Sequence, residues 1–172
     1  MDNARDRILD AAEELIAAGQ VPPSLEAVAA AAGVSKGGLL YHFDKRSLLT
    51  GLIVRAVGRA DERLTAAAAR GAMAATWLRL SAPGDDERRL HRGLLSMLRL
   101  TAGGDLDLPA EVARAEQRWH RMLTDELGDP VRGRLVRLAG DGLFLAALIG
   151  RPPTPGEVED VIADLGLRAG DA

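Results

Sequence analysis

Glycine and proline divide this chain into segments whose apolar residues recur every three or four positions. Such recurrence puts apolar side chains on one face of a helix, and Gly or Pro marks where a helix stops. The first segment ends before Gly19 and has the apolar residues Ile8, Ala12, Leu15 and Ile16. Runs of β-branched residues are scarce. The sequence therefore predicts an all-α protein with about nine helices.

Capping residues give the expected starts of several helices. Ser24 and Ser35 each precede a short apolar-periodic segment, and Asp44 precedes a long one. Further along, Asp129 precedes a helix that we expect to reach 149, and Thr154 opens a capping box. The breaks "SAPGDDE" and "TAGGDLDLPAE" bound a helix to about residue 100, and another is expected over 110–127.

Composition excludes several classes of protein. The 172 residues are 47% hydrophobic and 27% charged, as in globular domains. The absence of cysteine excludes a disulfide framework, cysteine zinc sites and thiol catalysis. The charged, amphipathic N-terminus is no signal peptide, and no apolar run approaches the ~20 residues of a membrane span. We therefore expect a cytoplasmic protein with no membrane partner.

The charge of the chain does not point to nucleic acid by itself. The net charge is −3 and the pI about 5.6. Residues 1–46 hold five basic and seven acidic side chains, a net charge of −2. Four of these acids lie in the first helical segment, whereas Lys36, Lys45 and Arg46 lie close together in the sequence. Any binding of DNA must therefore depend on local placement of charge.

Residues 24–43 have the layout of a helix-turn-helix motif. Two short helical segments are joined by the three-residue turn Gly33-Val34-Ser35, and the second helix of such a motif enters the major groove of DNA. On a helical projection, Leu39 and Phe43 fall together on the core side. The other side carries Gly37, Gly38 and Tyr41, with Leu40 and His42 on its flanks.

The outward side of this third helix is nearly bare of side chains. Two glycines let the backbone approach DNA closely, and the N-terminal end of the helix favours a phosphate. Tyr41 can contact sugar and phosphate, and Lys36 can reach a guanine edge or a phosphate. The alternative is that the glycine pair is a frayed turn and Tyr41 a half-buried ring. Periodicity alone does not decide between the two.

The stretches "RILDAAEELIAAG", "SLEAVAAAAGVSKGGLLYHF" and "DKRSLL" resemble the DNA-binding domain of the TetR (tetracycline repressor) family, over about residues 5–55. The resemblance implies a DNA-binding domain at 2–62 and a ligand-binding and dimerisation domain at 63–172. It implies a homodimeric repressor on a palindromic double-stranded DNA operator. Binding of a small-molecule effector, which we expect to be apolar, would release that operator.

The same resemblance implies roles for individual residues. Ser24 matches the phosphate-contacting start of the second helix, and 35–37 match the start of the recognition helix. Tyr41 and His42 match its phosphate-contacting end, and Lys45 matches a phosphate-binding lysine of the fourth helix. The implied DNA-binding set is Ser24, Ser35, Lys36, Gly37, Gly38, Tyr41, His42 and Lys45.

The chain departs from the family pattern at four places. Leu40 stands where many members have a tyrosine, which removes one phosphate contact. Gly38 stands where Thr, Ser or Ala is usual, which removes a potential base contact. The loop after Phe43 is one residue short, and Pro22-Pro23 replaces polar residues.

The C-terminal two thirds carry no comparable motif. In 131–149, apolar residues alternate at spacings of three and four, as in a helix-bundle seam; they are Leu135, Leu138, Gly142, Leu145 and Ile149. Such a stripe is core or a dimer interface, and family position favours the interface. In 110–127 the same spacing is broken by one polar residue, Glu126. Candidates for an apolar pocket, which are also ordinary core residue types, are Trp77, Met97, Trp119, Met122 and Phe144.

No pattern points to catalysis. His91 and His120 lack metal-like spacing, and neither a nucleophile elbow nor paired carboxylates occur. We therefore expect no metal, cofactor or catalytic residue. The competing class is an enzyme or small-molecule carrier built as a helical bundle, and a third is a DNA-binding protein without ligand control. Residues 24–45 favour the regulator, since an enzyme does not need them.

Overall fold

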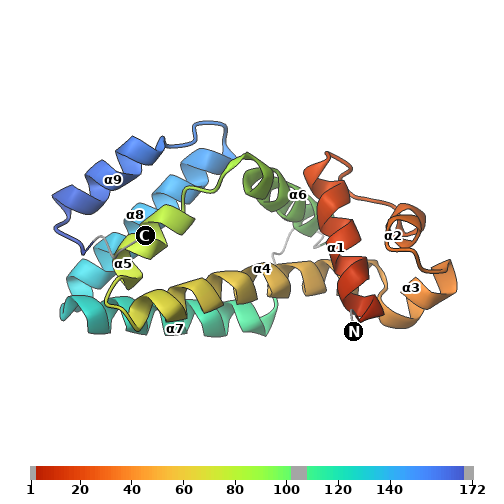
Figure 1. Ribbon diagram of the computed structural model, residues 1–172, viewed down its shortest axis with the longest axis horizontal. Coiled ribbons are helices and arrows are strands. Elements are labelled where there is room, and N and C mark those ends of the chain that lie inside the picture. Colours follow the sequence, from red (N-terminus) through yellow and green to blue (C-terminus); the bar gives the residue numbers. More distant parts are fainter. Residues whose placement is uncertain (1–2, 102–107, 169–172) are drawn as a thin grey trace. The chain divides into compact units, whose positions relative to one another are not determined.

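A computed structural model describes residues 3–101 and 108–168. These residues form nine α-helices and no strand, which confirms the all-α prediction. The helices, labelled in Figure 1, are α1 (Ala4–Ala17), α2 (Leu25–Ala31), α3 (Lys36–His42), α4 (Lys45–Ala68), α5 (Met73–Leu80), α6 (Asp85–Thr101), α7 (Ala110–Leu127), α8 (Pro130–Leu148) and α9 (Pro155–Asp164). None of the described helices is both long enough and apolar enough to cross a membrane.

The chain divides into two compact units. The first comprises residues 1–56 and 85–109, and the second comprises 57–84 and 110–172. Helix α4 contributes its first half to one unit and its second half to the other. Helix α6 thus groups with α1–α3, although it lies beyond the boundary expected at residue 62. The functional division at that residue stays a prediction.

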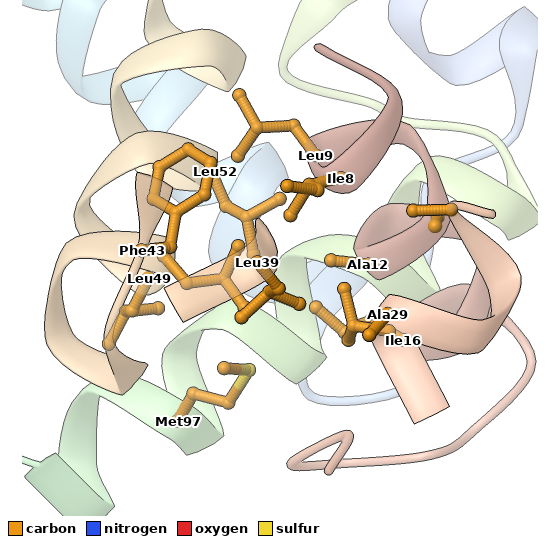
Figure 2. Packing of buried hydrophobic residues seen from close by; sticks show 14 of the residues in the cluster. Ile8, Leu9, Ala12, Ile16, Ala29, Leu39, Phe43, Leu49, Leu52 and Met97 are labelled. Carbon is orange, nitrogen blue, oxygen red and sulfur yellow. The ribbon is translucent and has the colours of Figure 1, made fainter. Parts of the chain in front are cut away.

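Side chains from α1, α2, α3, α4 and α6 form the core of the first unit. Figure 2 shows Leu39 and Phe43 among them, as the helical projection predicts. Leu39 is fully buried, and burial of a side chain of this size contributes about 1.5–3 kcal/mol. The large buried residues of the cluster are Ile8, Leu9, Ile16, Val28, Leu39, Phe43, Leu48, Leu49, Leu52, Leu94 and Met97. This core fixes the orientation of α3.

Helix α6 approaches α1 closely at Gly93. A Cβ added there would lie 2.1 Å from Ile16 Cγ2 and 3.2 Å from Val21 Cγ2. No side chain fits at the first distance, so the contact requires glycine. This packing holds α6 in the first unit, and the sequence periodicity of α6 gives no sign of it.

Helices α5, α7, α8 and α9 and the second half of α4 form the other unit. Its core includes Leu64, Met73, Leu78, Leu123, Val136, Val158 and Ile162. Helix α5 has no side-chain cap of its own. Instead the Glu126 carboxylate, on α7, accepts the backbone N–H groups of Met73 (2.6 Å) and Ala74 (2.9 Å). The polar break in the α7 stripe is therefore the cap of another helix.

Candidate nucleic-acid interface

Two serines begin the helices of the candidate interface. Ser24 Oγ accepts the N–H of Ala27 at 3.1 Å, and Ser35 Oγ accepts the N–H of Gly38 at 3.0 Å. Each bond satisfies a donor that the helix itself leaves free. Between the helices, Gly33 has a φ of +63°, a left-handed conformation that glycine adopts without strain. Both predicted caps are confirmed.

One side of α3 is buried and the other faces solvent. Leu39 is buried, whereas 86% of the Tyr41 surface is exposed and Leu40 is half exposed. The His42 ring, also exposed, lies edge-on to Tyr41 with the ring centroids 5.2 Å apart. Tyr41 is therefore not the half-buried ring of the alternative interpretation. A phenol left almost wholly in solvent contributes little to the core, so its position favours contact with another molecule.

The glycine pair lies inside the first turn of α3, since the helix starts at Lys36. A Cβ added at Gly37 would meet only Ser35 Oγ, at 4.0 Å, so this position is open. A Cβ at Gly38 would lie 3.2 Å from the same oxygen, which requires the N-cap to shift. The two glycines therefore differ: Gly37 keeps the surface bare, and Gly38 also accommodates the cap.

The Lys36 ammonium forms an ion pair with a carboxylate of the neighbouring helix. Its Nζ lies 2.5 Å from Glu26 Oε1 on α2, and about 60% of each side chain is exposed. The hydrogen bond from Lys36 lowers the pKa of the Glu26 carboxyl below its ordinary value. The charge of Lys36 is thus compensated within the motif, by a partner ten positions away on another helix.

Helix α4 begins at Lys45, directly after its cap. The Asp44 carboxylate accepts the N–H of Ser47 at 2.7 Å, and Ser47 Oγ accepts the N–H of Asp44 at 2.9 Å. The Ser47 hydroxyl, as a donor, lowers the pKa of the Asp44 carboxyl. This reciprocal pair fixes the first turn of α4. Lys45, the first residue of this helix, is exposed and follows the end of α3 by three residues.

Arg55 on α4 compensates part of the negative charge of α1. Its guanidinium donates to the carbonyl of Asp6 at 3.3 Å and pairs with Asp10, and Glu13 lies 3.9 Å away. Two of the four acidic side chains of α1 therefore face a cation within the same unit. The net charge of −2 for residues 1–46 leaves out Arg55 and therefore overstates the negative charge available to repel DNA.

Helix α8 carries an exposed apolar stripe in the second unit. Leu135, Leu138, Leu145 and Ile149 are between 53% and 59% exposed. A Cβ at Gly142 would meet nothing within 4 Å. Val131, one helical turn before Leu135, extends the stripe beyond the predicted residues and is 63% exposed. The predicted seam residues thus lie at the surface of the single chain and not in its core.

The predicted pocket residues do not all lie together. Trp77 and Trp119 are adjacent, with ring centroids 5.8 Å apart, and Met122 packs against the same core. Met97 instead belongs to the core of the first unit, and Phe144 is half-buried on α8. Residue type alone does not show which core a methionine joins, so the sequence gives no sign that Met97 lies apart from the other candidates.

Both indole N–H groups in this cluster have acceptors. Trp119 Nε1 donates to Asp61 Oδ1 at 2.8 Å, and Trp77 Nε1 donates to the carbonyl of Arg137 at 3.4 Å. Asp61 also pairs with Arg118, at 2.7 Å. The two rings are thereby oriented by bonds that the sequence did not suggest.

A cavity of about 540 Å³ opens in the second unit. Of the five predicted pocket residues, Met122 lines it. The charged part of its lining consists of Asp125, Glu126, Arg132 and Arg168. Arg132 donates to the carbonyl of Leu165 at 2.7 Å. This cavity is more polar than the apolar pocket expected from the sequence.

Among the described residues, the capped two-helix unit with its exposed second helix and the helical second unit define an all-α protein of the helix-turn-helix class. Comparison with family models agrees. Residues 8–50 match the model for bacterial regulatory proteins of the tetR family, and residues 71–166 match a tetracyclin repressor-like C-terminal domain. The chain belongs to the TetR family, whose members are DNA-binding transcriptional regulators.

Solved structures share the fold. A TetR-family member from Streptomyces coelicolor A3 is 25% identical, with a TM-score of 0.65, and the match covers 95% of this chain and 98% of that one. The multidrug binding protein EbrR, solved with imidazole, is 19% identical, with a TM-score of 0.59 and coverage of 99% and 98%. A TetR regulator from Rhodococcus sp. RHA1 is 20% identical, with a TM-score of 0.54 and coverage of 96% of each chain. No curated protein matches the chain significantly.

Proposed function

We propose that the chain is a cytoplasmic, non-enzymatic repressor that binds a palindromic operator as a homodimer and releases it when a small-molecule effector binds. The observation that carries this proposal is the exposed side of α3. Tyr41 is 86% exposed there, next to a glycine with open space around it, while Leu39 on the opposite side is buried. A surface of this kind is suited to enter a groove.

The residues around α3 have separate proposed roles. Ser24, Tyr41, His42 and Lys45 contact the phosphate backbone, which sets orientation without selecting a sequence. Lys36 reaches a base edge, and a lysine contacts the O6 and N7 acceptors of guanine. Ser35, Gly37 and Gly38 keep the start of α3 close to the groove.

The α8 stripe is the proposed dimer interface. Its apolar side chains recur at seam spacing and are more than half exposed in the single chain. A second copy related by a two-fold axis would cover the same stripe on both partners. Two α3 helices would then face two half-sites of an inverted repeat.

The effector is proposed to bind in the second unit near Trp77, Trp119, Met122 and Phe144. The adjacent indole rings are flat apolar groups of the kind that line small-molecule sites, and Met122 in the same cluster also lines the cavity. EbrR, which shares the fold, is a multidrug binding protein. A DNA-binding protein without ligand control is the alternative, which a ligand screen by thermal shift distinguishes.

Selection from a random duplex library tests the proposed function. The full-length protein should enrich an inverted repeat, and a scrambled half-site should weaken binding strongly. If repeated rounds enrich no common sequence, the proposal is wrong and the helical carrier or enzyme becomes the better interpretation.

A further inference from the structure

Glu26 and Lys36 bridge the two helices of the motif at its exposed edge. The pair joins the second residue of α2 to the first residue of α3, with 2.5 Å between Nζ and Oε1. Glu26 lies two residues after Ser24, the proposed phosphate contact. A carboxylate without a partner would repel DNA at this place. The pairing with Lys36 neutralises it.

The same bond restricts Lys36. Counterion release on DNA depends on cationic groups that neutralise phosphates, and an ammonium already paired with a carboxylate contributes little to it. Solvent-exposed ion pairs are weak, however, so the ammonium can exchange the carboxylate for other acceptors that are offered together. The O6 and N7 atoms of a guanine offer two acceptors to one ammonium at a single position of the groove.

We propose that Glu26 is a specificity-determining residue, which keeps the Lys36 ammonium from unrelated DNA and yields it only where the operator offers a base acceptor. The inference rests on the proposed function. Its consequence is that Glu26 weakens binding to unrelated DNA more than binding to operator. The lowered pKa of Glu26 agrees with a carboxylate that stays ionised and paired at neutral pH.

The test compares full-length variants by fluorescence anisotropy on the selected duplex and on a scrambled duplex of equal length. Glu26→Gln frees Lys36, so the scrambled duplex should bind about fivefold tighter at ~0.15 M salt, with a log–log salt slope steeper by about one. The selected duplex should gain less, so the discrimination ratio falls. Glu14→Gln removes the same charge from an exposed position of α1 and should leave that ratio nearly unchanged.

A second pair of variants separates this role from others. In a Lys36→Met background, Glu26→Gln should relieve repulsion equally on both duplexes and leave the ratio constant. A fall in the ratio in that background would show that Glu26 contacts a base by itself and would overturn the inference. Equal discrimination ratios for the Glu26→Gln and Glu14→Gln variants would also overturn the inference. If the parent chain prefers no duplex at all, the proposed function fails together with this inference.

Discussion

Truncation of Leu138 on α8 should weaken the proposed dimer about 30-fold. Leu138 is 53% exposed in the single chain, so about half of its burial energy is still available to a partner. Full burial of a leucine side chain contributes about 1.5–3 kcal/mol, which leaves about 1 kcal/mol for the interface. A two-fold axis brings both copies into the same seam, so Leu138→Ala removes about 2 kcal/mol, or roughly a 30-fold change in dissociation constant.

Sedimentation velocity over a dilution series measures this constant directly. Leu95→Ala is the matched control, because Leu95 is 40% exposed but lies on α6 in the first unit. We expect Leu138→Ala to shift the monomer–dimer midpoint and Leu95→Ala to leave it in place, with both variants folded by circular dichroism. Equal midpoints for the two variants would refute the assignment of the α8 stripe to the dimer interface.

Three further predictions concern single residues. Tyr41→Phe should weaken operator and unrelated DNA by similar factors, whereas Lys36→Ala should weaken the operator more, by about 1–3 kcal/mol in anisotropy titrations. Gly140→Ala should lower the unfolding free energy by about 1–3 kcal/mol in urea titrations, since its Cβ would lie 2.1 Å from Trp77 Nε1; an unchanged midpoint would contradict this packing. Hydrogen bonds from the Thr154 backbone N–H and hydroxyl lower the pKa of Glu157, so its carboxylate stabilises the fold above the ordinary pKa of 4.5 and this contribution is lost as the pH falls. The difference in melting temperature between parent and Glu157→Gln should therefore shrink from about pH 6 to about pH 3, and a constant difference would contradict the reasoning.

Helix positions could be predicted from the sequence because their causes are local. Ser24, Ser35, Asp129 and Thr154 each accept a backbone N–H two or three residues ahead, and this bond depends only on neighbouring residues. The buried side of α3, formed by Leu39 and Phe43, could be predicted from helical spacing, which is also a local property. Periodicity does not show whether Tyr41 is a half-buried ring or an exposed contact residue, and its 86% exposure excludes the half-buried ring.

Contacts between distant segments could not be predicted in this way. Glu126 caps α5 from 52 and 53 positions away, and Gly93 owes its identity to Ile16 on α1. Met97 joins a core formed mainly by the N-terminal helices. The Glu26–Lys36 pair spans ten positions and joins two helices, so it depends on how α2 and α3 pack and not on local sequence. A periodic pattern shows that a residue is on an apolar face but not which partner covers it.

The most direct test of the central claim is an NMR titration of the full-length protein with its selected duplex. DNA recognition by the exposed side of α3 predicts that the largest amide shift changes fall on residues 36–42, with further changes at Ser24 and Lys45. The backbone amides of Gly37 and Gly38 should move strongly, because no side chain separates them from the groove. Shift changes confined to the second unit, with residues 24–45 unaffected, would contradict the account.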